Sequence, residues 1–335
     1  MQNLHQKVVR TINYITLDLE WNQAERWRTN RSIPFEIIEI GAVKLDEDWN
    51  IIDHFSMLVR PKIYPHLFTK VTEIVNITER ELLQKGKPFP SVIKQFWDWC
   101  GEDFILCTWG SMDITELLRN VTYYRLKNPL QHPVYYCDIQ KIYSIQYSNG
   151  KTRSSLEAIA DELQIEGNLQ FHRAFSDAYY TAQIMKHLDR KLVDTYLSLD
   201  YFHLPSDISE EVNMTFDNYS KYVSRPFRNK NEALADSRVS SCVCYLCGTN
   251  VKKSIPWFSY YARCYYSAGI CPNHGWIRSK IRLKKDYSSQ RVYVFKTTKI
   301  VTQSDIQAIE AKREEVKEKR KKHADGEHLA NSTED

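Results

Sequence analysis

The stretch Tyr14-Ile-Thr-Leu-Asp-Leu-Glu20 decides the fold of the N-terminal part of the chain. Residues 14–17 are apolar or β-branched and predict a buried strand. Asp18 and Glu20 follow at the end of this strand, two residues apart. Because strand side chains alternate with a period of two, both carboxylates face the same side. The pair could form a site for a hard cation, but taken alone it is a weak signal and is more often an exposed strand end.

Outward from this strand, the pattern predicts an α/β sheet of mixed direction. Two further strands continue a meander, and two more then alternate with helices. The strands are expected at 37–45, 54–59, 104–109 and 134–137, and the helices at 91–99, 114–121, 156–163 and 177–188. Three consecutive strands followed by alternating elements are typical of a mixed sheet flanked by helices.

Three further polar residues can reach the same edge of this sheet. Asp113 lies just after the strand that ends at Trp109, and open α/β sheets bind ligands at the carboxyl ends of their strands. His172 precedes a helix in which Asp177 is in line with apolar positions. An unpaired buried carboxylate would cost several kcal/mol, so Asp177 should face a polar pocket or a metal. Taken singly, Asp113 could simply stabilise its helix dipole, and His172 with Asp177 could be a surface pair.

Together these residues form the series Asp-x-Glu, Asp, His-x4-Asp. Carboxylate oxygens suit Mg²⁺ or Mn²⁺, and two such ions about 4 Å apart can activate a water and stabilise the leaving oxygen of a phosphodiester. Histidine side chains titrate near neutrality, so His172 is expected to act as the general base. The set predicts metal-dependent hydrolysis of nucleic acid.

Three runs resemble the exonuclease motifs of the DEDDh, or DnaQ-like, 3′–5′ exonucleases. They are Leu17–Glu20, Trp109–Asp113 and His172–Ala178, and the resemblance covers roughly residues 13–192. The forms of the motifs are similar to the branch that holds KapD-type bacterial proteins and the eukaryotic histone-mRNA and small-interfering-RNA exonucleases. The resemblance implies a ribonuclease-H-like fold, with Asp18, Glu20, Asp113 and Asp177 as metal ligands and His172 as base.

Two residues beside these ligands are expected to contact the substrate, namely Leu19 and Trp21. Aromatic rings stack on bases, so Trp21 at the mouth of the site could bind a terminal base. A tryptophan that follows a strand is more often part of the core, which is the alternative for Trp21.

The C-terminal part differs from the rest in charge and in cysteine content. Residues 237–323 contain 19 basic and 6 acidic residues, although the whole chain has a net charge of only +4. Five of the eight cysteines lie in the same part. A chain without an export signal favours metal over disulfides for such clustered cysteines. A polyanion such as nucleic acid is the expected partner of this basic part, with a solvated basic surface as the alternative.

The cysteine spacing predicts one structural Zn²⁺. Cys244-x2-Cys247 and Cys271-x2-His274 have the ligand spacing that is typical of two zinc knuckles. The register is not unique, because Cys242 could replace Cys244 and Cys264 could displace His274. Reduced structural cysteines are the alternative to zinc.

A basic strand follows the second knuckle. Alternation sends Arg278, Lys280 and Arg282 to one side, where basic groups can hold phosphates while nearby aromatic rings stack on bases. The alternative is that most of the aromatic rings fill the core. We expect these three residues to contact nucleic acid.

The chain is therefore predicted to be an α/β protein with a ribonuclease-H-like mixed sheet, followed by a small β-rich zinc domain and a charged C-terminal helix. The expected boundaries are an exonuclease domain at 10–199, a connecting arm at 200–236 lying on that domain, a basic zinc module at 237–302, and a charged helix with a disordered tail at 303–335.

Composition excludes membrane proteins. Mean hydropathy is −0.52, and no apolar run approaches the 18 residues of a membrane span. The polar N-terminus carries no secretory pattern, so a cytoplasmic location is expected. The predicted function is 3′–5′ exonucleolysis of single-stranded RNA or short overhangs. A DNA exonuclease and a catalytically silent nucleic-acid-binding or zinc adaptor protein are the alternatives, since the sequence does not separate RNA from DNA.

Overall fold

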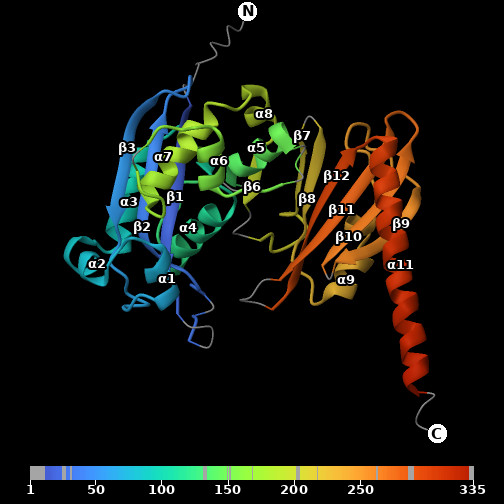
Figure 1. Ribbon diagram of the computed structural model, residues 1–335. Coiled ribbons are helices and arrows are strands. Elements are labelled where there is room, and N and C mark those ends of the chain that lie inside the picture. The colour runs from blue at the N-terminus through green and yellow to red at the C-terminus, as the bar shows by residue number, and fades with distance from the viewer. Residues whose placement is uncertain are drawn as a thin grey trace, which may run out of the picture. The chain divides into compact units, whose positions relative to one another are not determined.

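The polypeptide divides into two compact units, Met1–His203 and Leu204–Asp335, as the computed structural model in Figure 1 shows. The structure describes residues 12–24, 28–30, 32–130, 134–148, 150, 152–167, 169–200, 204–216, 218–261, 263–285 and 290–331. Within these residues, no helix is both long enough and apolar enough to span a membrane.

The first unit is built on a six-stranded mixed sheet. Its strands are β1 (Asn13–Asn22), β2 (Glu36–Leu45), β3 (Ile51–Leu58), β4 (Phe104–Thr108), β5 (Val134–Asp138) and β6 (Ser198–Asp200). They lie in the order β3-β2-β1-β4-β5-β6, with β1 antiparallel to β2 and parallel to β4. The four strands expected after the first are present within a few residues of their predicted ends, so the predicted meander and mixed sheet are confirmed.

Helices cover both faces of this sheet. They are α1 (Thr69–Ile74), α2 (Glu79–Lys85), α3 (Phe89–Cys100), α4 (Met112–Tyr123), α5 (Ile139–Ser148), α6 (Leu156–Glu162), α7 (Ala174–Met185) and α8 (Arg190–Thr195). Helices α3 and α4 bury their apolar sides against one face, together with Ile15, Leu17 and Leu19 of β1. Helices α5, α6 and α7 pack on the other face.

Strand β1 has two different faces, and this difference positions the site. Ile15, Leu17 and Leu19 point into the core under α3 and α4. Alternation therefore turns Thr16, Asp18 and Glu20 toward the face that α7 covers. The Thr16 hydroxyl donates to the carbonyl of Ala178 in α7 over 2.8 Å, which ties the helix to this face.

The second unit is a six-stranded antiparallel sheet with three helices. Its elements are β7 (Val212–Phe216), β8 (Tyr219–Val223), α9 (Lys230–Ala235), α10 (Ser237–Ser240), β9 (Lys253–Tyr261), β10 (Cys264–Cys271), β11 (Gly275–Lys285), β12 (Val292–Ile300) and α11 (Gln303–Asn331). The strand order is β7-β8-β12-β11-β10-β9. Strands β11 and β12 pair as an antiparallel hairpin.

The predicted connecting arm at 200–236 is wrong. Residues 204–236 belong to the second unit, where β7 and β8 extend the sheet from β12. The arm contains polar residues and prolines, but β7 alternates between less and more exposed positions, and β8 pairs with β7 on one side and with β12 on the other. Residues 201–203 of the expected arm lie outside the described residues.

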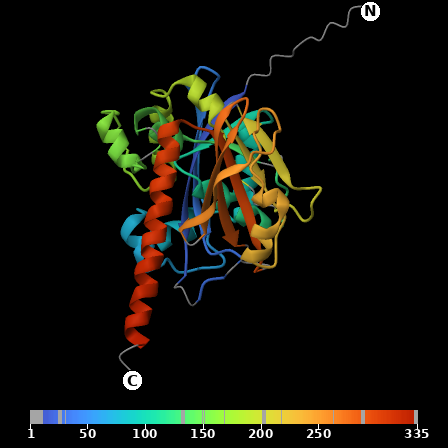
Figure 2. The ribbon, with the colours of Figure 1, turned by 90° about the vertical axis from the view of Figure 1, so that its right-hand side faces the viewer.

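The C-terminal helix is partly embedded. Ile306 and Ile309 of α11 are buried against Ile255 and Tyr266 of the sheet, so the thin apolar stripe of this helix packs on one face (Figures 1 and 2). The helix continues to Asn331, into the segment for which we expected disorder. Lysine, glutamate and alanine dominate α11, and their high helix propensity favours this extension. Residues 332–335 and 10–11 of the predicted boundaries lie outside the described residues.

Candidate active site and metal clusters

A close approach of α7 to β2 brings the acidic residues together. Gly41 is the partner of Asp18 across the β1–β2 ladder. A Cβ atom at Gly41 would lie 2.0 Å from the backbone of Ala174, at the start of α7. Only glycine leaves room for the helix to begin at this point. The first turn of α7, which carries Asp177, therefore lies directly over the Asp18 side of the sheet.

Three of the predicted metal ligands form one cluster. Oxygen atoms of Asp18, Glu20 and Asp177 all lie within 4.8 Å of one another. Asp113, in the first turn of α4, is buried beside them, and its carboxylate accepts a hydrogen bond of 3.2 Å from the backbone N–H of Leu19. The geometry supports the predicted grouping of all four carboxylates, with Asp113 adjoining the tighter group of three.

The carboxylates raise one another's pKa. Burial raises the pKa of Glu20 to about 8 and that of Asp113 to about 7, and the nearby carboxylates add to both effects. Burial and the charges of Asp113 and Asp177 also raise the pKa of Asp18 well above its usual range. Burial raises the pKa of Asp177 to about 6, although neighbouring His172 opposes the increase. Such a group of buried acids fits divalent cations, which supply the missing positive charge.

His172 lies at the exposed start of this arrangement. Its side chain is exposed, and its backbone adopts a φ of 62°, which is uncommon for a residue other than glycine. Its position next to Asp177 agrees with the predicted role as base, because the ring is accessible to water and close to the carboxylates.

Sequence analysis missed an ion pair that supports His172. Glu39 of β2, which pairs with Glu20 across the ladder, is 1% exposed. Its carboxylate accepts hydrogen bonds from Arg173 Nε at 3.1 Å and Nη2 at 2.8 Å, and from the Ala174 N–H at 3.1 Å. The sequence signal for this ion pair was a carboxylate inside the apolar run of β2. Its partner, Arg173, is too distant in the sequence for the pairing to be recognised there.

The substrate role of the Leu19 side chain is wrong. Leu19 is 3% exposed and packs in the core, because alternation turns it away from Asp18 and Glu20. Only its backbone N–H contributes to the site. Trp21 is half-buried, and its ring packs at 5.7 Å from the ring of Phe35. Stacking of Trp21 on a terminal base stays a prediction.

A mixed sheet with carboxylates from β1, α4 and α7 and a histidine at the start of α7 defines a nuclease site. The family model described as "Exonuclease", RNase_T, matches residues 15–185. The chain belongs to this exonuclease family and is a 3′–5′ exonuclease that hydrolyses nucleic acid. The ribonuclease-H-like fold and the KapD-like resemblance are confirmed.

Two curated relatives come from Bacillus subtilis (strain 168). "Probable 3′-5′ exonuclease KapD" is 25% identical over 209 residues, which cover 61% of this chain and 96% of the relative. "DNA polymerase III PolC-type" is 27% identical over 190 residues, which cover 55% of this chain and 12% of that protein. Among solved structures, the nuclease domain of 3′hExo, described as a DEDDh family member bound to rAMP, is 23% identical with a TM-score of 0.48. The match covers 57% of this chain and 98% of that domain.

A second cluster lies in the other unit. It consists of the predicted ligands Cys244, Cys247, Cys271 and His274, whose donor atoms lie within 4.8 Å of one another. Cys247 Sγ is 3.5 Å from Cys271 Sγ, and His274 Nδ1 is 3.5 Å from Cys244 Sγ. Hydrogen bonds from Thr249 lower the pKa of Cys247 to about 6, which favours the thiolate form that binds metals.

The two alternate ligands are not members of this cluster. Cys242 is fully buried, and its Sγ lies 3.3 Å from the hydroxyl of Ser279. Cys264 begins β10, at the opposite end of that strand from Cys271. Of the two registers that the spacing left open, the structure therefore favours Cys244 and His274.

The predicted basic face is present on β11. Arg278, Lys280 and Arg282 alternate with buried Ile277, Ser279 and Ile281, so the three cationic residues share one face of the strand. The Lys280 ammonium lies 5.3 Å from the ring centre of Tyr266 on the neighbouring strand β10. The face therefore combines positive charge with aromatic rings.

Proposed function

We propose that this exonuclease removes nucleotides from the 3′ end of single-stranded RNA, or of short RNA overhangs, by a two-metal mechanism with His172 as general base. The observation that carries the proposal is the cluster of Asp18, Glu20 and Asp177 within 4.8 Å, with exposed His172 next to Asp177. Asp113 adjoins this cluster and completes the ligand set for two Mg²⁺ or Mn²⁺ ions.

Each residue has a separate task in the proposed reaction. Two divalent ions bound by the four carboxylates would stabilise the attacking and leaving oxygens. His172 accepts a proton from the attacking water, whose oxygen bonds to phosphorus. The bond between phosphorus and the 3′ oxygen of the preceding nucleotide breaks, and that oxygen takes a proton. The products are a nucleoside 5′-monophosphate and a strand one nucleotide shorter.

The second cluster is proposed to hold one structural Zn²⁺. At a Zn–S distance of about 2.3 Å, tetrahedral geometry separates two sulfur ligands by about 3.8 Å. The 3.5 Å between Cys247 Sγ and Cys271 Sγ is close to this value. The ion would fix the two loops that carry the ligands and add folding energy to the second unit.

The basic face of β11 is proposed to bind the substrate strand away from the catalytic site. Arg278, Lys280 and Arg282 would contact phosphates, while the half-buried ring of Phe295, which pairs with Arg282 across the ladder to β12, offers a surface for bases. Neither contact depends on a particular base sequence, so this face would add affinity for long strands without base specificity.

DNA is the second candidate substrate. The PolC-type relative is named as a DNA polymerase, and it is 27% identical to this chain over 190 residues. Recognition of the 2′-OH separates RNA from DNA, and none of the four carboxylates or His172 distinguishes the two by its chemistry. The substrate assay below therefore decides between them.

The test uses the purified chain with 5′-labelled single-stranded RNA, single-stranded DNA and their duplexes, with Mg²⁺, with Mn²⁺ or without divalent ion. A ladder that shortens from the 3′ end faster on RNA supports the proposal, whereas faster degradation of DNA favours the second candidate. Asp18→Asn and Asp177→Asn should each abolish the ladder. The exposed residue Asp98 in α3 provides the matched control, because Asp98→Asn makes the same chemical change away from the site. Full activity in the Asp18 or Asp177 variant would contradict the two-metal site.

A further inference from the structure

The second sheet carries a row of hydroxyl groups on the face opposite the basic strand residues. Cross-strand pairing places these residues side by side across five strands: Thr215, Ser220, Thr298, Ser279 and Ser267. Ser279 and Ser267 are fully buried, and Thr298 is 4% exposed. A sheet face under helices and loops is usually apolar, because that is where burial stabilises the fold most. This row is therefore a polar surface in a position where core residues are expected.

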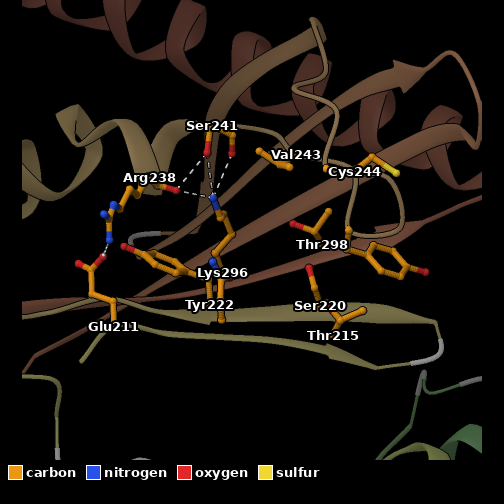
Figure 3. A pocket seen from close by; sticks show the side chains of 13 residues that line it. Glu211, Thr215, Ser220, Tyr222, Arg238, Ser241, Val243, Cys244, Lys296 and Thr298 are labelled. Carbon is orange, nitrogen blue, oxygen red and sulfur yellow. Dashed lines mark hydrogen bonds and ion pairs between the residues drawn. The ribbon is translucent and has the colours of Figure 1, made fainter. Parts of the chain in front are cut away.

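The row opens into a pocket at its β7 and β8 end. The pocket has a volume of about 460 Å³. Thr215, Ser220 and Thr298 lie along one side of it, and Lys296 extends from the same strand as Thr298 toward Ser241 (Figure 3). This volume falls within the range of about 300–1,000 Å³ that is typical of small-molecule sites. It is larger than an inorganic anion needs.

Cations line one wall of the pocket. Lys296 is 8% exposed, and its ammonium donates to the carbonyls of Arg238 and Ser241 over 2.5 and 3.1 Å (Figure 3). Burial lowers the pKa of Lys296 to about 8, so the group still carries a positive charge at neutral pH. These two carbonyls and the Ser241 hydroxyl, at 3.4 Å, hold the Lys296 ammonium in place, and its charge acts on the pocket without a further bond.

Arg238 supplies donors at the edge of the same wall. Its Nη1 atom bonds to Glu211 at 3.1 Å and to the carbonyl of Ile208 at 3.3 Å. The side chain is 52% exposed. Among the described residues no other bond of this guanidinium is recorded, which leaves Nε and Nη2 as donors for a ligand. Guanidinium groups are suited to phosphate because their donors match its oxygens.

The charges around the pocket leave it positive. Glu211 and Asp236 are the carboxylates of this region, and Arg225 bonds to both of them, at 2.5 and 2.9 Å. Together with Arg225, the side chains of Arg238 and Lys296 make three cations in this region, which contains two carboxylates. The excess of one positive charge favours an anion over a neutral or cationic ligand.

We propose that this pocket binds one nucleoside monophosphate unit, either as a free nucleotide or as a residue of a strand, outside the catalytic site. The phosphate lies against Arg238 under the charge of Lys296, and the hydroxyls of Thr215 and Ser220 bond the sugar and the polar edge of the base. Tyr245, which is half-buried and lines the same pocket, offers a ring for contact with the base. The choice of a nucleotide among phosphate-bearing ligands rests on the proposed function, whose substrate and product are both nucleotides.

The pocket also depends on the metal cluster. Cys244 lines the pocket and belongs to the Cys/His cluster. Loss of the metal would loosen the loop that forms this wall, so nucleotide binding is expected to require the loaded cluster. We therefore expect nucleotide binding only when the second unit is intact.

The test is a calorimetric titration of AMP into the full chain carrying Asp18→Asn and Asp177→Asn. The zinc-loaded protein is dialysed against buffer without other divalent ions, so that the catalytic carboxylates do not retain the nucleotide. Binding of one AMP per chain is expected. Ser220→Phe, which fills the pocket, and Arg238→Gln, which removes the phosphate donor, should each weaken it by at least 10-fold. Thr297→Val is the matched control, because Thr297 is on the same strand as Lys296 but on the other face of the sheet.

Three results would overturn the proposal. They are the absence of AMP binding, equal affinity in the Ser220→Phe and control proteins, and displacement of AMP by inorganic phosphate at equal concentration. A short single-stranded RNA with a blocked 3′ end that competes with AMP would identify the strand as a source of the nucleotide, and failure to compete would identify the free nucleotide. Exonuclease activity of the chain with intact carboxylates is measured separately. A negative result there would contradict the proposed function and leave the titration unaffected.

Discussion

Glu39 and Arg173 are 134 positions apart in the sequence and form a partly buried ion pair that joins β2 to the start of α7. Two hydrogen bonds connect the side chains, and a third joins Glu39 to the backbone of Ala174. His172 immediately precedes Arg173, and Asp177 follows one turn later. The pair therefore fixes the segment that carries both the proposed base and a proposed metal ligand.

Removal of the Arg173 charge should lower kcat more than it changes KM. Arg173→Met leaves the Glu39 carboxylate without its partner and allows the start of α7 to shift, and misplacement of about 1 Å can cost roughly 10²-fold in rate. Arg173→Lys keeps the charge but not the two-donor geometry, so it should recover part of the rate. Steady-state kinetics on a short RNA measures both parameters. A parallel loss in thermal stability and KM, with kcat unchanged, would show that the pair serves the fold alone.

His172→Ala should reduce turnover by roughly 10²- to 10⁴-fold, the usual contribution of a general base. Metal binding should persist, because the four carboxylates remain in place. The matched control is His187→Ala, which removes an exposed histidine from the segment after α7. Wild-type turnover in the His172 variant at every pH would assign the base to another group.

The metal-free protein should lose stability as the pH rises from about 5 to 8. The folded-state pKa values of Asp177, Asp113 and Glu20 are about 6, 7 and 8, whereas ordinary carboxylates titrate near about 4. In this window the folded state binds more protons than the unfolded state, so the free energy of unfolding falls with pH. These groups make their full contribution to the free energy of unfolding below about pH 4, and this contribution is lost above about pH 8.

Thermal melts between pH 5 and 8.5, with and without Mg²⁺, test this dependence. Mg²⁺ supplies positive charge to the ionised carboxylates, so it should raise Tm more at pH 8 than at pH 6. Replacing Asp18 and Asp177 by Asn should flatten the slope in the absence of metal. An equal effect of Mg²⁺ at both pH values would contradict the assigned ligand set.

One zinc ion per chain should copurify with the protein when no chelator is used. Cys271→Ser should remove or weaken this ion and lower the stability of the second unit, because the ligand holds two loops together. Cys264→Ser is the control, since Cys264 is not part of the cluster. Elemental analysis measures the metal content of both variants. Full zinc content in the Cys271 variant would exclude this ligand.

Neutralising the basic face of β11 should weaken binding of long strands and reduce its salt dependence. Each lost phosphate contact lowers the slope of log K against log salt by about 0.7 for a single strand, so Arg278→Gln, Lys280→Gln and Arg282→Gln together should lower it by up to about 2. The control makes the same charge change at Lys94, Lys186 and Lys191, which are exposed in the first unit. Equal slopes in the two triple variants would refute the role of β11 in binding.

The strands of the first unit could be predicted because their apolar runs are continuous and their ends carry distinctive residues. Helix α5 was not predicted from the sequence, although Ile139, Ile142 and Tyr143 have helical spacing and are buried. It begins directly after β5, with the Asp138 carboxylate accepting from the N–H of Lys141, so no turn residues mark its start. Strands β7 and β8 were missed because short polar strands show their pattern only against their neighbours.

The site was predictable where chemistry follows sequence spacing. Asp18 and Glu20 are two residues apart on a strand, and Cys244 and Cys247 lie in one knuckle, so local geometry brings each pair together. The ion pair of Glu39 and Arg173 depends on the close approach at Gly41, which is a tertiary contact with no counterpart in local sequence. Leu19 was misassigned because its neighbours are ligands, whereas the period of the strand turns its side chain into the core.

The backbone at His172 places activity and stability in opposition. A φ of 62° is strained for any residue with a Cβ atom, although histidine tolerates it better than most. Glycine at this position would relieve the strain but would lack the ring that is proposed to take the proton. A sequence optimised for folding stability alone would therefore not have histidine at this position. The imidazole of His172 therefore stands on a backbone that costs the fold stability, at the point where the proposed base is needed.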